Sequence, residues 1–280
     1  MNTCNVGSWG IGLLYPEVTE EYPEYERKLH DIGKKLYELI TRKAIHNGQG
    51  VLFHNVDLLY IYIDTIYFSV PVLAKLARRI ERKGWERKAL RQLRSHLEIL
   101  RDPDSNFFIH CEQNMTGLRS EGTWGRGNGW VAMTCAELLS VLDPKSEDYL
   151  IVCRILGSLS THLLSYQTET GLWRTIINNA TSYKETSASA MFAMGMIRGQ
   201  RTGILGKEFD IPIERGIQGL CQYVDKNGVF TGTSEGTWPG TIEYYKGLNT
   251  GEWWWGTGAL LLTLTEYHKL RQEKADITNP

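Results

Sequence analysis

Gly171-Leu-Trp-Arg174 is a turn residue followed by apolar and aromatic residues, and this short pattern decides the fold because it recurs. Equivalent stretches are Gly50-Val-Leu-Phe53, Asn106-Phe-Phe-Ile109 and Gly228-Val-Phe-Thr231, at successive intervals of 56, 65 and 57 residues. Each stretch is followed by a polar and aromatic loop, a segment rich in small residues, and a second segment of helical character. A period of this length that holds two helices indicates a helical-hairpin repeat.

The segments between the turns have apolar residues at three- and four-residue spacing, which is the period of an amphipathic helix. Between residues 21 and 44 the apolar positions are Tyr25, Leu29, Ile32, Leu36, Leu39 and Ile40. Sustained strand alternation is found in no part of the sequence, so we predict an all-α fold. The predicted helices span about residues 21–44, 64–82, 85–101, 128–142, 147–166, 185–202, 208–224 and 256–271.

Hairpins stacked in sequence form either an open solenoid or a closed ring. In a closed ring the joints between hairpins gather at one end, where loops from different repeats can line one cavity. The charged and aromatic residues of this sequence lie on the joints, whereas a protein-binding solenoid would place them along a helix face. We therefore favour a closed (α/α) barrel. Because linker-like and low-complexity stretches are missing from the sequence, residues 1–280 are predicted to form a single domain.

Composition and charge exclude several classes of protein. Lys and Arg number 31 against 32 Asp and Glu, so bulk charge excludes nucleic-acid binding. The densest basic stretch, Arg78 to Arg94, alternates with acidic and apolar residues and is interpreted as a solvent-exposed helix face. Apolar runs stay shorter than 18 residues, so no membrane-spanning helix is expected. The N-terminal residues lack the basic start and apolar stretch of a secretory signal, and we expect a cytoplasmic protein.

Cysteine and histidine spacing gives no indication of a metal or a cofactor. The five cysteines, including Cys4, are scattered and form no CxxC pair, which argues against a disulfide framework or a zinc site. Zinc-protease, P-loop and nucleophile-elbow patterns are also missing from the sequence. The nine Trp and fourteen Tyr among 28 Gly suit stacking against sugar rings, and they suit ordinary core packing as well.

Trp124-Gly-Arg-Gly-Asn-Gly-Trp130 is the sharpest candidate motif. Its three glycines let the backbone approach a ligand closely, and Arg126 offers a planar fork for a carboxylate. The segment leads directly into a predicted helix, so its N–H groups also suit an anion. The alternative is a tight interhelical turn with packed aromatic residues.

Several acids and one histidine lie on the joints. Asp64 stands at the start of an apolar helix, where it is either an N-cap or a catalytic carboxyl with a raised pKa in a dry pocket. His110, Glu112 and Glu121 lie between the second turn stretch and Trp124. Taken alone, each of these acids is more typical of a solvated loop than of a site.

The run Trp124-Gly-Arg-Gly-Asn-Gly-Trp-Val-Ala-Met133 resembles the signature of glycoside hydrolase family 105, the unsaturated rhamnogalacturonyl hydrolases, which are relatives of the family 88 unsaturated glucuronyl hydrolases. Three further segments match family motifs in the same order: Ile63-Asp-Thr-Ile-Tyr-Phe-Ser-Val-Pro71, Glu185-Thr-Ser-Ala-Ser-Ala-Met-Phe192 and Trp255-Gly-Thr-Gly-Ala-Leu-Leu-Leu262. The resemblance covers roughly residues 50 to 270 and implies an (α/α)6 barrel, in agreement with the hairpin period.

The resemblance also implies a reaction. The substrates of the family are lyase-generated oligosaccharides that end in a 4,5-unsaturated uronic acid. A carboxylic acid protonates C4, water adds at C5, and the resulting hemiketal opens and expels the aglycone. One acid must be protonated near neutral pH, which requires a raised pKa from burial or from a neighbouring carboxylate. Cofactors and metals are not expected.

Carried over by position, the resemblance implies a catalytic role for Asp64, which matches the first of two important aspartates. His110 matches a family histidine, but the expected second aspartate is missing between it and Trp124, where Glu112 and Glu121 are the only acids. We expect Glu112 or Glu121 to act with Asp64. The residues expected to bind the sugar are His110, Trp124, Arg126, Trp130, Trp173, Arg174, Glu185 and Trp255.

Two rival hypotheses keep the barrel. The missing aspartate favours a non-catalytic carbohydrate-binding relative, whereas another sugar-processing barrel, such as an epimerase or a phosphorylase, would need more histidines on the joints. The partner expected is an oligosaccharide, with no nucleic acid and no membrane, and the protein is expected to be a monomer or a homodimer. Because 63 residues precede Asp64 and about eight helices are predicted where six hairpins need twelve, we expect an abbreviated N-terminal hairpin.

Overall fold

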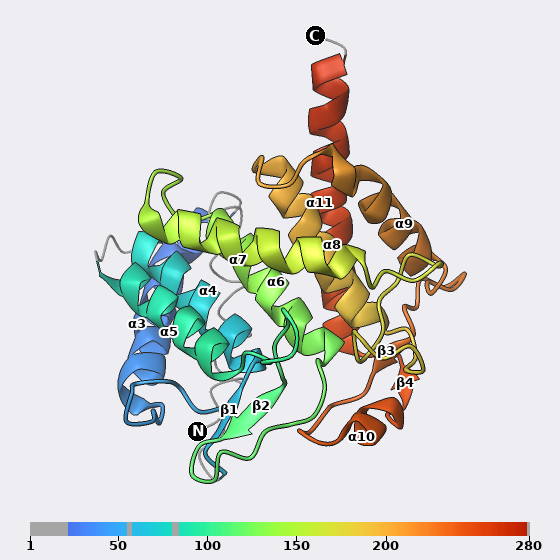
Figure 1. Ribbon diagram of the computed structural model, residues 1–280. Coiled ribbons are helices and arrows are strands. Elements are labelled where there is room, and N and C mark those ends of the chain that lie inside the picture. Colours follow the sequence, from blue (N-terminus) through green and yellow to red (C-terminus); the bar gives the residue numbers. More distant parts are fainter. Residues whose placement is uncertain (1–21, 55–57, 80–83, 279–280) are drawn as a thin grey trace.

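The computed structural model describes residues 22–54, 58–79 and 84–278, and helices dominate these ranges (Figure 1). The prediction of an all-α fold is confirmed, and most predicted helix boundaries agree with the observed ones within about one turn. Cys4, the first 21 residues of the expected N-terminal hairpin and the end of the helix predicted over 64–82 lie outside the described residues. The long helices are α3 (Glu26–Glu38), α4 (Asp64–Arg79), α5 (Trp85–Ile99), α6 (Gly125–Leu139), α7 (Glu147–Leu164), α8 (Thr186–Arg201), α9 (Asp210–Cys221) and α11 (Trp254–Thr278).

Short elements that the sequence did not predict lie between the long helices. Two antiparallel ladders of two strands each correct the expectation that strands are missing. Their strands are only two or three residues long, too short to produce a visible alternation. The short elements are the turns η1 (Pro23–Tyr25), η2 (Leu39–Lys43) and η3 (Lys207–Phe209), the helix α10 (Ile242–Lys246), and the strands β1 (Tyr60–Tyr62), β2 (Cys111–Gln113), β3 (Thr233–Ser234) and β4 (Thr250–Gly251).

The helices form a central and an outer layer. In the central layer α4, α6, α8 and α11 contact one another in this order. Every residue of α6 is buried and so is most of α8, because both helices have small or apolar residues on all sides. Outside them, α5 packs on α4, α7 on α6 and α8, and α9 on α8, as Figure 1 shows for α7 lying across α6. This alternation is the arrangement expected for stacked hairpins.

The turn stretches found in the sequence share one backbone geometry. Three of them have a glycine with positive φ, 81° at Gly50, 83° at Gly171 and 84° at Gly228. In each of these turns, the N–H group three residues before the glycine donates to the carbonyl of the residue directly after the glycine, at 2.9 Å. The turn at Asn106 has an equivalent hydrogen bond, from Asp102 to Phe107, at 3.0 Å. The predicted repeat is therefore confirmed as a repeated structure.

Alanine substitutions at Gly171 and Gly228 distinguish the cost of backbone strain from the cost of a steric clash. An alanine Cβ at Gly171 would collide with the carbonyl oxygen of Arg215, whereas a Cβ at Gly228 meets nothing within 4 Å. Gly228→Ala is expected to lower the free energy of unfolding by about 1–2 kcal/mol, the cost of a left-handed alanine. Gly171→Ala should cost about 1–3 kcal/mol more, because the buried turn must move. Urea unfolding of both variants checks this, and equal losses would contradict it.

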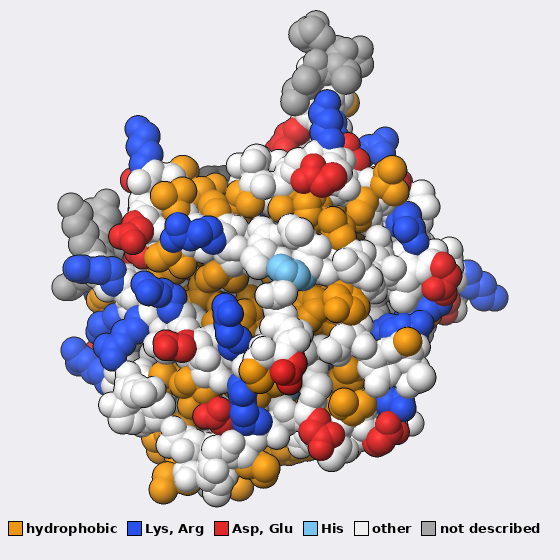
Figure 2. Space-filling model, in the orientation of Figure 1, with side chains coloured by type: hydrophobic (Ala, Val, Ile, Leu, Met, Phe, Trp, Pro, Cys, Tyr) orange, Lys and Arg blue, Asp and Glu red, His pale blue; other side chains and the backbone are white. Residues whose placement is uncertain are grey.

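The basic stretch predicted as a solvated face is exposed on α5. Arg87, Lys88, Arg91 and Arg94 lie on its outer side. Figure 2 shows several basic side chains over α3 and α5, with acidic side chains interspersed over the rest of this face. Among the described residues, helices long and apolar enough to cross a membrane are absent.

Candidate active site

The loops that follow the turns meet at one end of the helical layers, the lower end in Figure 1. Two of these loops pair through β1 and β2, where Tyr62 lies opposite Cys111. Beyond the ladder, the Ile63 N–H donates to the carbonyl of His110 at 2.9 Å. This pairing places the first residue of α4, Asp64, beside His110.

Asp64 is held by two side chains from the next repeat. Its Oδ1 accepts a hydrogen bond from Nε1 of Trp130 at 3.0 Å. Its Oδ2 lies 3.4 Å from Nε2 of His110. The carboxylate remains 16% exposed, so it is largely enclosed and still open to solvent on one side. Asp64, His110 and Trp130, which were all predicted as site residues, are therefore brought together.

The pKa of Asp64 lies below its ordinary value. Burial raises this pKa, but the contact with His110 and the charges of His110, His54 and Arg126 lower it by more. The raised pKa considered for this carboxyl is therefore not found. An ionised carboxylate at neutral pH suits a base better than a proton donor.

His110 lies inside a box of aromatic rings. Its Nδ1 is 3.0 Å from Oη of Tyr245, and its ring centroid lies 4.1 Å from that of Trp124 and 5.1 Å from that of Tyr62. The His110 side chain is only 1% exposed. Contact with Asp64 and Tyr245 occupies both ring nitrogens. His110 therefore contacts Asp64 directly, and its predicted part in sugar binding stays a prediction.

Arg126, within the Trp124 motif, binds the loop that follows the turn at Gly228, which is the last joint along the sequence. One terminal nitrogen donates to the carbonyl of Ser234 at 3.0 Å, and the other donates to the carbonyl of Glu235 at 2.9 Å and to Oγ1 of Thr237 at 2.6 Å. Its guanidinium lies 4.6 Å from the ring centroid of Trp124. These donors bind a loop of the protein, and the binding of a substrate carboxylate by Arg126 stays a prediction.

Trp255 and Trp124 enclose Arg126 from two sides. The guanidinium lies 5.5 Å from the Trp255 ring centroid, and Trp255 Nε1 donates to the carbonyl of Ser234 at 3.2 Å. Trp124 is 1% exposed, whereas Trp255 is partly exposed. Of these two predicted sugar-binding rings, Trp255 is therefore the one that remains accessible.

Glu185 is the N-cap of α8 and is fully buried. Its Oε2 accepts from the Ala188 N–H at 2.6 Å, and its Oε1 accepts from the Ser234 N–H at 2.8 Å and lies 3.6 Å from Arg126. These contacts satisfy the carboxylate inside the protein. Glu185 is thus held by internal contacts, and its predicted contact with sugar stays a prediction.

In the joint after Gly171, the aromatic side chain of Trp173 lies in the core. Trp173 is 0% exposed and its Nε1 donates to the carbonyl of Leu163 at 2.8 Å, so it belongs to the core and not to a sugar-binding wall. Its neighbour Arg174 stays half-buried and donates to the carbonyl of Ser182 at 2.5 Å. The two adjacent residues predicted to bind the sugar thus have different surroundings.

The two glutamates expected to replace the missing aspartate have partners other than Asp64. Glu112, in β2, pairs with Arg119 at 3.5 Å and is 26% exposed. Glu121 is exposed and accepts from the Ile242 N–H at 3.1 Å, at the start of α10. The contacts of Asp64 within the described residues are with Trp130 and His110.

Sequence reasoning missed several residues of this site. Tyr62, Tyr245 and Ser234 come from segments without a recognisable motif, and only their tertiary contacts identify them. Of the eight buried side-chain polar atoms without a hydrogen-bond partner in the described ranges, three lie here, namely Tyr62 Oη, Asp64 Oδ2 and Trp124 Nε1. Such atoms are costly to bury unpaired, so these three leave polar groups around His110 and Asp64 unsatisfied within the protein. In the described part of the chain, clusters of His, Cys, Asp or Glu suited to a metal ion are absent.

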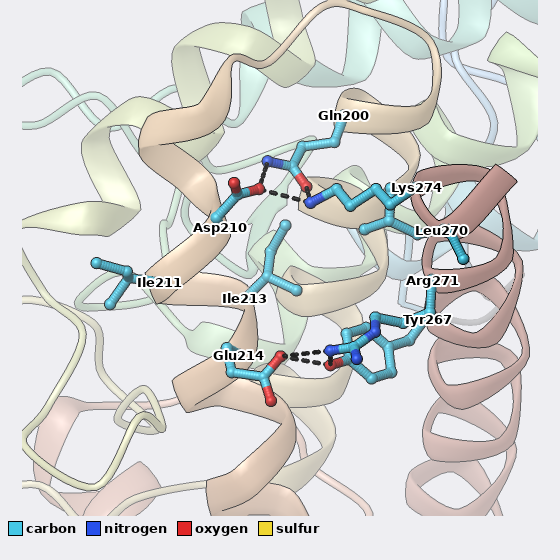
Figure 3. A pocket seen from close by; sticks show the side chains of 10 residues that line it. Gln200, Asp210, Ile211, Ile213, Glu214, Tyr267, Leu270, Arg271 and Lys274 are labelled. Atoms are coloured by element: carbon cyan, nitrogen blue, oxygen red, sulfur yellow. Dashed lines mark hydrogen bonds and ion pairs between the residues drawn. The ribbon is translucent and has the colours of Figure 1, made fainter. Parts of the chain in front are cut away.

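A cavity of about 630 Å³ lies elsewhere, between α9 and α11 (Figure 3). Its charged residues pair with one another, Asp210 with Lys274 at 2.6 Å and Glu214 with Arg271 at 3.9 Å. Gln200 places this cavity at the far end of α8 from Glu185, roughly 22 Å along the helix. It is therefore separate from the Asp64 site.

Comparisons with known proteins give a consistent set of relatives. The family model described as glycosyl hydrolase family 88 matches residues 1–271. The unsaturated rhamnogalacturonyl hydrolase YesR of Bacillus subtilis is 28% identical over 214 residues, which are 74% of this chain and 60% of YesR. An unsaturated 3S-rhamnoglycuronyl hydrolase of Formosa agariphila is 21% identical over 230 residues, 77% of this chain and 59% of that protein.

Solved structures share the fold. A possible member of family GH105 from Klebsiella pneumoniae superposes with a TM-score of 0.86 at 24% identity, over 94% of this chain and 70% of that one. The unsaturated glucuronyl hydrolase of Bacillus sp. GL1 superposes with a TM-score of 0.65 at 18% identity, over 85% of this chain and 67% of that one. The helical-barrel fold predicted from the sequence is thereby confirmed. The chain spans about 60% of the length of the curated relatives named above.

Proposed function

The chain belongs to glycosyl hydrolase family 88, and from this premise we propose that it removes a 4,5-unsaturated uronic acid from the non-reducing end of lyase-generated oligosaccharides. The observation that carries the proposal is the enclosed carboxylate of Asp64, held by Trp130 and His110 at the joint end of the barrel. The substrate class follows YesR, whose name specifies unsaturated rhamnogalacturonyl substrates.

The reaction consumes one molecule of water. A proton is added to C4 of the enol ether, and the water oxygen bonds to C5 while its proton is taken by a base. The hemiketal formed at C5 then opens and releases the second sugar as an alcohol. The protein must therefore supply one proton donor and one base, with groups that hold the uronate between them.

Asp64 is proposed as the base. Its lowered pKa keeps it ionised near neutral pH, which favours removal of a proton from water and stabilisation of positive charge at C5. Trp130 and His110 fix the carboxylate by contacts to different oxygens, so it need not reorient during the reaction. Trp255 and the half-buried Arg174 are the predicted sugar-binding residues that stay accessible.

Glu112 is proposed as the proton donor, ahead of Glu121. Glu112 lies on β2, two residues after His110 in the sequence. Its ion pair with Arg119 is long, at 3.5 Å. Glu121 instead binds the N-terminus of α10 and has a structural task. Gln113, which stands near the expected place of the second aspartate, lies opposite Tyr60 in the ladder and carries no acid.

Glutamine substitutions distinguish the two glutamates. Glu112→Gln is expected to lower kcat by about 100-fold or more, the usual contribution of a general acid. Glu121→Gln keeps an oxygen for the Ile242 N–H and should leave kcat near that of the wild type. The measurement is the decline in ultraviolet absorbance as the C=C bond of lyase-made rhamnogalacturonan or glucuronan fragments is hydrated. The reverse ranking would assign the acid to Glu121.

A non-catalytic carbohydrate-binding protein is the second candidate, because the contacts of Asp64 within the described residues include no second carboxylate. It predicts binding of the same fragments, measured by calorimetry, with no decline in their absorbance. An active wild-type protein would reject it.

A further inference from the structure

Tyr245 completes a chain of polar contacts that ends at Asp64. It lies in the short helix α10 and is 0% exposed. Its Oη is 3.0 Å from Nδ1 of His110 and accepts from the Gly240 N–H at 3.2 Å. On the other side of the imidazole, Nε2 lies 3.4 Å from Oδ2 of Asp64. The chain Tyr245–His110–Asp64 thus joins three different joints of the barrel.

The surroundings of His110 favour one of its two tautomers. Nε2 faces a carboxylate, so it must be an N–H donor and not a lone pair. In the tautomer with the proton on Nε2, Nδ1 is an acceptor, and the group facing it must donate. The phenol of Tyr245 can do so, because the Gly240 N–H already occupies one of its lone pairs.

We propose that Tyr245 is a positioning residue for the reaction: its hydroxyl donates to Nδ1 and fixes His110 with the Nε2 proton toward Asp64. The inference rests on the proposed function and adds a residue from the last joint to it. A phenyl ring would fill the same space, so the hydroxyl is the part of Tyr245 that this role requires. Without it, Nδ1 would be buried with no donor, and the imidazole would hold the carboxylate less rigidly.

Nitrogen-15 NMR of the His110 ring tests the hydrogen bond directly. The protein has seven histidines, and the His110 signals are assigned by their loss in His110→Asn. In the wild type, Nε2 should carry the proton, and Nδ1 should show the shift of a hydrogen-bonded acceptor. In Tyr245→Phe, the Nδ1 signal is expected to move toward that of an unbonded nitrogen. The matched control is Tyr244→Phe, since the neighbouring Oη accepts from the Trp238 N–H and should leave His110 unchanged.

Kinetics supply the second measurement. Tyr245→Phe is expected to lower kcat about tenfold, the equivalent of one hydrogen bond, with KM nearly unchanged because Tyr245 is fully buried. Tyr244→Phe should retain the kcat of the wild type. A change in KM alone in Tyr245→Phe would contradict a positioning role.

The outcomes separate this inference from the proposed function. If the wild type is active but the Nδ1 signal of His110 is unchanged in Tyr245→Phe, the inference is overturned and the proposed function stands. A protein inactive on every unsaturated fragment, with a responsive signal, would reject the function while supporting the placement of His110. A wild-type spectrum in which Nδ1 carries the proton would overturn the inference without any variant, so the test does not depend on the folding of Tyr245→Phe.

Discussion

Asp64→Asn is expected to lower kcat by about 100- to 10,000-fold, because the substitution removes the proposed base and leaves its hydrogen bond in place. The amide oxygen of the substituted side chain can still accept from Trp130, so folding should be retained. The decline in absorbance of unsaturated fragments measures the effect. Asp225→Asn is the matched control, because Asp225 is an exposed aspartate in the last turn stretch and should keep full activity.

The pH profile of the wild type adds an independent check on Asp64. A base must be ionised, so activity is lost as the pH falls through its pKa in the folded protein. Because that pKa lies below the ordinary 3.8, activity should persist to a lower pH than an unperturbed aspartate would allow. The shift also contributes stability above pH 3.8 that disappears below the lowered pKa. A loss of kcat/KM centred well above pH 4 would show that another group acts as the base.

Glu185→Ala is expected to lower the free energy of unfolding by about 3–5 kcal/mol, because it leaves the buried charge of Arg126 without its counter-ion and removes the cap of α8. Ser146→Ala provides the comparison: Ser146 caps α7 at 3.1 Å in a partly exposed position, and its loss should cost about 1 kcal/mol. Urea unfolding of both variants gives the two values.

A conservative substitution of Glu185 distinguishes a structural role from a role in substrate binding. Glu185→Gln keeps one acceptor oxygen and the volume of the side chain, but it removes the charge beside Arg126. If Glu185 has a purely structural role, the KM of this variant should stay near that of the wild type while its stability falls. A large rise in KM with unchanged stability would restore the sugar-binding role expected from the sequence.

The hairpin fold could be predicted because its signals are local. The turn stretches at Gly171 and Gly228 depend on a positive φ that glycine adopts readily, and helical spacing is visible within a single segment. The motif around Arg126 leads into a helix, as its sequence predicted. The strands β1 to β4 could not be predicted, because two or three residues are too few to establish an alternation.

The orientation of side chains within the joints could not be predicted from the sequence. Trp173 and Trp255 are both aromatic residues on joints, yet one is buried in the core and the other partly exposed. Glu185 resembles an ordinary loop acid in the sequence, and only its contact with Ser234 reveals a buried cap. The role of Tyr245 depends on the same kind of long-range contact, so no local pattern could have indicated it.

The contacts between distant joints determine when the site becomes complete during synthesis. His110 and Tyr245 are 135 positions apart, and Arg126 and Ser234 are 108 apart. Pairs so far apart form late, because closing a long loop costs entropy before the contact can repay it. The ribosome releases Asp64 and Trp130 well before it makes the last joint. In a nascent chain the site around the Asp64 carboxylate therefore lacks its contacts with the last joint. The arrangement described above exists only after the C-terminal hairpin has docked.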